Sequence, residues 1–131
     1  MFSGGGGLCG SCVTNHADGQ IFTPPYLLNP DGGVRPRPAI TGAPATASAG
    51  DTVTVDTDRV VTGFALTRLG AVTHTVNNDQ RRIPLVPTAI SDTSYTVTIP
   101  ADRGIVLPGY YMLFALDSAG VPSVAKMIRI G

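Results

Sequence analysis

The chain has 131 residues, nine basic and nine acidic side chains and no net charge, which excludes a strongly basic nucleic-acid binder and a polybasic membrane-surface domain. All nine acids are aspartate, and lysine occurs once, so two strong helix-forming residue types are almost missing. Sixteen glycines and eleven prolines accompany many valines and threonines. A chain of this length forms one domain that buries roughly 65–70% of its unfolded surface. The composition therefore predicts an all-β domain.

Residues 1–38 are predicted to form an N-terminal segment that connects the rest of this chain to an upstream domain missing from it. Four glycines follow Met1-Phe2-Ser3, and nothing there resembles the basic and apolar regions of a signal peptide. Asp31-Gly32-Gly33 is a turn signal, and Arg35-Pro-Arg-Pro favours extended backbone. Further along, the longest apolar run is Tyr110–Leu116, far shorter than the roughly 20 residues of a membrane span.

Residues 39–131 predict an immunoglobulin-like β-sandwich. Apolar and polar residues alternate in short stretches separated by turn signals, and about seven such stretches fit that fold. Leu107–Leu116 is apolar on both faces, as expected for a central strand. The expected strands are 52–55, 59–69, 71–76, 83–86, 94–99, 107–116 and 122–130. Residues expected to share one face of their strand include Val60, Phe64 and Leu66; Val72, His74 and Val76; Tyr95, Val97 and Ile99; and Val124, Ile128 and Ile130.

Cys9 and Cys12 form a C-x-x-C, for which three interpretations stay open. A disulfide across so small a loop contributes only about 2 kcal/mol, so it would fix a local turn. A redox pair needs a helix after the motif to lower the pKa of one thiol, and the surrounding glycines argue against a helix. A zinc site would use both cysteines with His16, and its fourth ligand, His74, lies far away in the sequence.

His74 and the polar cluster Asp79-Gln80-Arg81-Arg82 are the other candidates for chemistry. A histidine in a strand can simply bond a neighbour, but neutral imidazole also suits copper or zinc. One histidine needs partners, and His16 is the only other one in the chain. The cluster can be a solvated hairpin end with a weak Asp–Arg pair, or an interface in which arginine makes bidentate bonds.

Six stretches of unusual sequence are distributed over essentially the whole chain. They include the glycine run with its C-x-x-C and the stretch Thr-His-Thr-Val-Asn-Asn-Asp-Gln-Arg-Arg around His74. The stretches are Gly4–Cys12, Thr14–Asp18, Gln20–Leu27, Thr73–Leu85, Leu107–Phe114 and Ala119–Ala125. In the same order, they closely resemble the C-terminal part of the galactose oxidase-like copper radical oxidases.

The resemblance implies the early set β-sandwich domain of a larger secreted enzyme. In that family a kelch propeller carries most of the active site, and a hairpin of the sandwich delivers one histidine to the copper. By motif that histidine is His74. The resemblance also implies a disulfide between Cys9 and Cys12, and an interface with the propeller at Asp79, Gln80, Arg81 and Arg82. The family oxidises a primary alcohol to an aldehyde and reduces oxygen to hydrogen peroxide, using copper and a Cys-crosslinked tyrosyl radical.

This chain departs from the family pattern because it contains none of the other residues that hold the copper or form the radical. The radical tyrosine, its cysteine partner, the second tyrosine ligand and the second histidine ligand all belong to the propeller. We therefore expect the chain alone to bind copper weakly at best and to leave alcohols unoxidised. An exposed hairpin around residues 70–85 is expected to favour self-association.

Two further hypotheses remain open. One is a stand-alone β-sandwich module that binds carbohydrate or a partner protein. The absence of tryptophan argues against sugar stacking, and so does the expectation that the tyrosines pack within apolar strands. The tyrosines in question are Tyr26, Tyr95, Tyr110 and Tyr111. The other hypothesis is an autonomous metal protein that uses His16 and His74.

Overall fold

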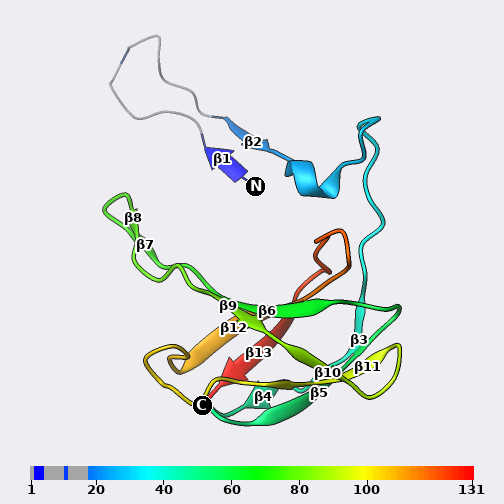
Figure 1. Ribbon diagram of the computed structural model, residues 1–131. Coiled ribbons are helices and arrows are strands. Elements are labelled where there is room, and N and C mark those ends of the chain that lie inside the picture. Colours follow the sequence, from blue (N-terminus) through cyan, green and yellow to red (C-terminus); the bar gives the residue numbers. More distant parts are fainter. Residues whose placement is uncertain (1, 5–10, 12–17) are drawn as a thin grey trace. The chain divides into compact units, whose positions relative to one another are not determined.

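The computed structural model describes residues 2–4, 11 and 18–131 of the chain (Figure 1). Contacts within the chain divide it into two units, Met1–Arg35 and Pro36–Gly131. Apart from one 3-10 turn, every regular element in the described ranges is a β-strand, which confirms the all-β prediction. No helix in these ranges is long and apolar enough to cross a membrane.

The first unit contains a small antiparallel sheet and one 3-10 turn. Its elements are β1 (Phe2–Gly4), β2 (Gly19–Ile21) and η1 (Pro25–Leu27). The predicted turn forms after η1, where the backbone N–H of Gly33 donates to the Asp31 carboxylate at 2.9 Å. Gly32 has a φ of 84° in this turn, a conformation that glycine adopts without steric cost.

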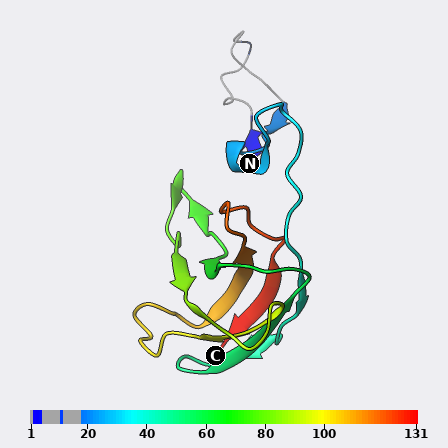
Figure 2. The same cartoon turned by 45° about the vertical axis from the view of Figure 1, so that its right-hand side comes forward.

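The second unit is a sandwich of two facing sheets (Figures 1 and 2). Its strands are β3 (Ile40–Gly42), β4 (Thr46–Ala47), β5 (Thr52–Thr57), β6 (Gly63–Arg68), β9 (Arg82–Leu85), β10 (Pro87–Ala89), β11 (Ser94–Thr98), β12 (Gly109–Leu116) and β13 (Lys126–Ile130). The four-stranded sheet has the order β10-β11-β5-β3, and the five-stranded sheet has the order β4-β13-β12-β6-β9. The remaining two strands form a separate hairpin.

The core lies between the inner faces of the two sheets. Alternate residues of β12 are buried, and Tyr111, Leu113 and Ala115 are at most 1% exposed. From the opposite sheet Tyr95 meets Phe64 edge to face, with ring centroids 5.6 Å apart. The buried Tyr95 hydroxyl donates to the Asp92 carbonyl and accepts the Val61 N–H, so its polar atom is satisfied. The alternation predicted from the sequence therefore builds this core.

The predicted strands differ from the observed ones in number and in some ends. The two sheets have four and five strands rather than about seven in total, because β3, β4 and β10 are too short to show alternation. The strand expected at 59–69 begins only at Gly63, which leaves Val60 outside it and 59% exposed. Val124 also lies outside its expected strand and is 69% exposed. Burial was expected for all four tyrosines and is found for two, while Tyr26 and Tyr110 are more than half exposed.

The four edge strands of the sandwich are short or irregular. β9 contains Pro84, and β10 begins with Pro87. β4 has two residues, and it is the one strand in the sandwich paired in parallel, with β13. β3 has three residues, and its register against β5 shifts between Ile40 and Gly42.

Candidate functional site

His74 lies in the turn of a hairpin that projects from the sandwich (Figure 1). The two strands, β7 (Val72–Thr73) and β8 (Val76–Asn77), pair antiparallel with Thr73 opposite Val76. The two turn residues, His74 and Thr75, have φ values of 51° and 68°. Positive φ at both positions is the geometry of a type I′ hairpin, which strongly prefers Asn-Gly.

The single strand expected at 71–76 is therefore wrong. The valines at 72 and 76 alternate with polar residues on both sides of a two-residue turn, so the pattern alone looks like one continuous strand. Neither His74 nor Thr75 is a residue type that signals such a turn. Each pays about 1–2 kcal/mol for a left-handed backbone. The fold thus places a histidine at a turn position that sequence preferences disfavour.

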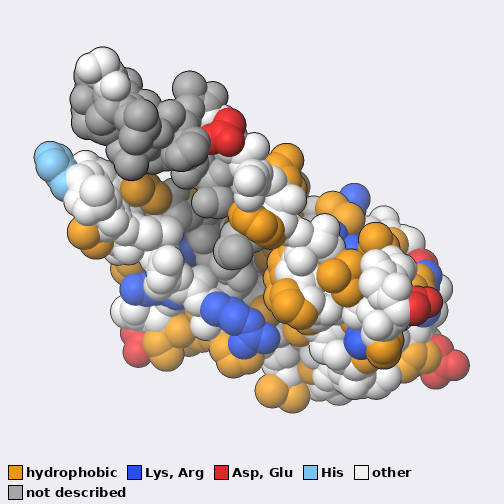
Figure 3. Space-filling view, turned by 90° about the horizontal axis from the view of Figure 1, so that it is seen from above, with side chains coloured by type: hydrophobic (Ala, Val, Ile, Leu, Met, Phe, Trp, Pro, Cys, Tyr) orange, Lys and Arg blue, Asp and Glu red, His pale blue; other side chains and the backbone are white. Residues whose placement is uncertain are grey.

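The His74 imidazole is exposed and is held at one ring nitrogen. Its Nδ1 lies 2.8 Å from the Thr73 hydroxyl oxygen. When Nδ1–H donates to this hydroxyl, the Nε2 lone pair is left to face outward as a metal ligand. The one histidine in the described part of the chain is drawn in pale blue in Figure 3.

No cluster of three or more His, Cys, Asp or Glu side chains in the described part of the chain could hold a metal ion. A metal ion at His74 would need its other ligands from outside the described residues. The remaining residues of the predicted zinc and disulfide sites, Cys9, Cys12 and His16, lie outside the described residues.

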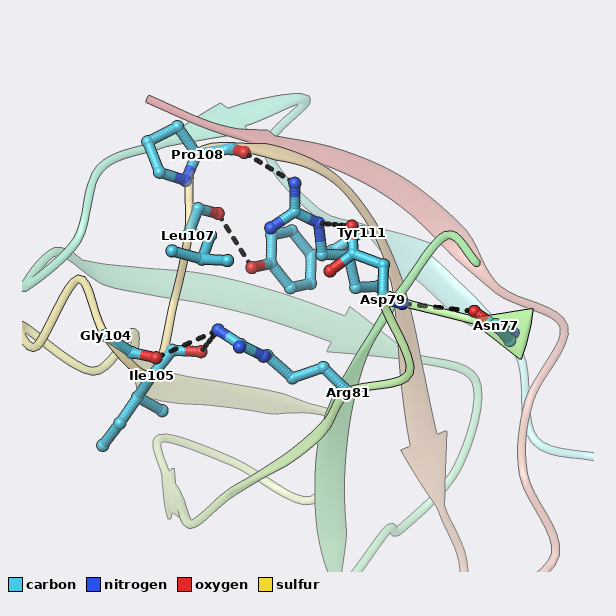
Figure 4. Close-up of polar contacts among 9 residues, drawn as sticks. Asn77, Asp79, Arg81, Gly104, Ile105, Leu107, Pro108 and Tyr111 are labelled. Carbon is cyan, nitrogen blue, oxygen red and sulfur yellow. Dashed lines mark hydrogen bonds and ion pairs between the residues drawn. The ribbon is translucent and has the colours of Figure 1, made fainter. Parts of the chain in front are cut away.

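Arg68 connects the base of this hairpin to the five-stranded sheet, and Figure 4 labels its partners Asp79, Pro108 and Tyr111. Its Nε lies 2.8 Å from Oδ2 of Asp79, and Nη2 donates to the Pro108 carbonyl at 3.2 Å. The guanidinium carbon lies 5.9 Å from the ring centroid of the buried Tyr111, within cation–π range. Gly109 has a φ of 142°, and a Cβ there would come within 3.2 Å of Arg68 Nη2. One arginine thus joins the hairpin base to the start of β12.

A second arginine, Arg81, connects the other side of the base to the loop before β12. Its Nη1 donates to the carbonyls of Gly104 and Ile105 at 3.0 and 2.8 Å (Figure 4). The Asp79 backbone N–H donates to the Asn77 side-chain oxygen at 3.3 Å. Two of the four expected interface residues, Asp79 and Arg81, therefore have partners within the domain itself. Sequence reasoning missed Arg68, because an arginine at a strand end carries no pattern that points to a distant aspartate.

An open pocket of about 560 Å³ lies at this base. Its walls include the three arginines at positions 68, 81 and 82. Basic side chains on this face are blue in Figure 3. The lining residues are Thr67, Arg68, Gly70, Asn77, Gln80, Arg81, Arg82 and Met112.

Asp58 and Arg59 form the other ion pair that the structure shows in its described part, on the turn between β5 and β6. The side-chain hydrogen bond from Arg59, helped by the Ala39 N–H, lowers the pKa of Asp58 from its usual value. The same hydrogen bond raises the pKa of Arg59. Both side chains are largely solvated, and the pair lies on a different turn from the hairpin, so we assign it no functional role.

The sequence matches the family described as "Galactose oxidase-like, Early set domain" over residues 37–130. A galactose oxidase of Gibberella zeae is 53% identical over 99% of this chain, and the match covers 19% of that protein. The aldehyde oxidase GLOX of Vitis pseudoreticulata is 31% identical over 85% of this chain and 23% of its own length. The chain thus spans about a fifth of the curated relatives it matches.

A solved structure of a fungal alcohol oxidase in complex with copper superposes with a TM-score of 0.90. It is 46% identical, and the superposition covers 98% of this chain and 28% of that one. The two proteins are therefore similar in backbone fold as well as in sequence. The immunoglobulin-like sandwich expected from the sequence has its counterpart in these proteins. The chain belongs to the galactose oxidase-like early set domain family.

Proposed function

We propose that this chain is the C-terminal domain of a galactose oxidase-like copper radical oxidase and that His74 is one of the copper ligands. The carrying observation is the placement of His74 at the tip of a projecting hairpin, with Nδ1 at the Thr73 hydroxyl. The names of the relatives support the proposal, since they include galactose oxidase and a copper-bound alcohol oxidase.

The remaining copper ligands and the Cys–Tyr radical cofactor belong to a kelch-type propeller in the same polypeptide. When bound, copper and that radical supply the two-electron oxidation of a primary alcohol to an aldehyde, with oxygen reduced to hydrogen peroxide. Because these groups lie outside this chain, we expect the isolated chain to be inactive.

The chain's own residues hold the ligand in place. Thr73 fixes the ring orientation of His74 through its hydroxyl. Arg68, Asp79 and Arg81 fix the direction in which the hairpin leaves the sandwich. The surface from Asp79 to Arg82, with Gln80 and Arg82 exposed, packs against the propeller.

The N-terminal segment continues from the propeller into the sandwich. Cys9 and Cys12 form a short disulfide there, which fits a secreted enzyme in an oxidising environment. This pairing is readily tested by mass spectrometry of the intact protein with and without reductant.

The central test replaces His74 by alanine in the full-length protein. Copper content and peroxide production are both expected to be lost, while the thermal unfolding midpoint stays close to that of the wild type. Thr73→Val is expected to lower copper affinity roughly 10–100-fold, because the ring loses the hydroxyl that orients it. Thr41→Val, an exposed threonine on β3, is the matched control. Full copper occupancy and activity in the His74→Ala protein would refute the proposal.

A carbohydrate-binding module is the second candidate, and one observation favours it. Tyr110 on β12 is 56% exposed and offers an aromatic surface to a sugar ring. Binding of the isolated chain to a glycan array, lost in Tyr110→Ala, would support this function. No binding in the wild type would remove it.

A further inference from the structure

Positive charge is concentrated at the pocket below the hairpin. Three of the eight arginines in the chain line it, and no aspartate does. Asp79 pairs with Arg68 from outside the lining, so three positive charges minus one negative charge leave an excess of two. The chain as a whole has no net charge, so this excess is a local feature.

Two of these arginines have hydrogen-bonding capacity that the domain itself does not use. Arg68 Nη1 is buried and has no hydrogen-bond partner, although Nε and Nη2 of the same group are bonded. A buried donor without an acceptor destabilises the fold, because it has lost its hydrogen bonds to water. Arg82 is exposed on the edge strand β9 and makes no side-chain bond with another described residue. Guanidinium groups make charge-assisted and often bidentate hydrogen bonds with carboxylates.

We propose that this pocket receives an aspartate or glutamate side chain from the remainder of the same polypeptide. The inference rests on the proposed function, since it takes this chain to be one domain of a larger oxidase. The chain spans about a fifth of its curated relatives, so proteins of that length contain further polypeptide from which such a side chain can come. The acidic side chain balances the excess charge and gives an acceptor to the exposed Arg82 guanidinium on the pocket wall. The base of the hairpin is then fixed from both sides.

The test converts the contact into a covalent bond in the full-length protein. Arg82→Lys places an amine at the pocket, and a zero-length carbodiimide joins an amine only to a carboxylate that touches it. We expect an isopeptide bond between position 82 and an acidic residue outside residues 1–131, found by mass spectrometry of the digest. Gln80→Lys provides a second probe on the same pocket wall.

Arg129→Lys is the matched control, because Arg129 is exposed on β13 and does not line the pocket. A parallel reaction with an added small amine, which couples to exposed carboxylates, reports that the reagent is active. Unfolding midpoints show that each variant is folded. Cross-links from positions 80 and 82 but not from 129 support the inference. Their absence from both pocket positions, bonds only to residues within 1–131, or equal bonding at 129 would overturn it.

This test separates the inference from the proposed function. A protein that holds copper through His74 but gives no pocket cross-link keeps the function and loses the inference. A protein that gives the cross-link but retains copper after His74→Ala keeps the inference and loses the assignment of the ligand.

Discussion

The sandwich and the hairpin arm, residues 69–81, are stabilised in opposite ways. The sandwich buries its large apolar side chains almost completely, as Phe64 and Leu66 on β6 show. The arm continues directly from β6 but exposes its apolar residues, with Val72 73% and Val76 54% in solvent. Two residue pairs and a hydrogen bond from the Asn78 N–H to the Ala71 carbonyl hold its strands together. Its attachment to the sandwich is polar and lies at its base.

This difference shows how a small domain can present one side chain far from its core. The apolar core supplies the free energy of folding, and the arm contributes little to it. The arginine contacts at the base fix where the arm points. The stability of the domain and the position of the His74 side chain therefore depend on different residues. Substitutions in the sandwich and in the arm are expected to change the free energy of unfolding by different amounts.

The largest effect is expected for Phe64→Ala in the core. Losing a fully buried ring and its edge contact with Tyr95 lowers the free energy of unfolding by about 3–5 kcal/mol. Val72→Ala in the arm is the control, and its cost stays below about 0.5 kcal/mol. Urea denaturation of both variants measures the difference. A comparable cost for Val72→Ala would mean that the arm is part of the cooperative core.

An intermediate effect is expected for Arg68→Ala at the base of the arm. The side chains of Arg68 and Asp79 are 18% and 26% exposed, between a surface pair and a buried one, so we expect a loss of about 2 kcal/mol. Hydrogen exchange at the Asn78 amide should accelerate as the arm loosens. In the isolated chain, where the rest of the polypeptide is missing, Arg82→Ala should change neither quantity. If Arg68→Ala leaves exchange in the arm unchanged, the arginine does not position it.

The smallest effect is expected for Thr75→Gly at the tip. Glycine relieves about 1–2 kcal/mol of left-handed strain but loses more backbone entropy on folding, which leaves a net gain of about 0.5 kcal/mol. The denaturation midpoint should rise slightly, with Thr41→Gly as a control that should lower it. A drop in stability for Thr75→Gly would show that the threonine side chain makes a contribution larger than its strain.

Much of the fold follows from the sequence, because alternation reports burial directly. β11 and β12 were predicted within two residues of their ends, and their inward residues Tyr95, Val97 and Tyr111 are buried. Three of the four edge strands, β3, β4 and β10, were not predicted, because two or three residues cannot show a period. Val60 and Val124 were wrongly assigned to strands, since a valine next to a strand looks the same as one inside it.

The site was predictable only in part. The motif around His74 pointed to a metal ligand through its resemblance to a family, while the residue pattern alone placed it in the middle of a strand. The turn is imposed by the pairing of Val72 with Asn77 and of Thr73 with Val76, not by the residue types at its tip. Arg68 and its contact with Pro108 join positions 40 residues apart, which no local pattern reveals.

The irregular edges of the sandwich bear on aggregation. A long flat edge strand offers a row of free N–H and C=O groups on which another chain can add a strand. Here Pro84 and Pro87 each remove a donor from an edge, β4 is only two residues long, and β3 is interrupted by a shift in register. Each of the four edges is therefore protected by a proline, by its shortness or by a shift in register, so none offers a long regular strand to another chain.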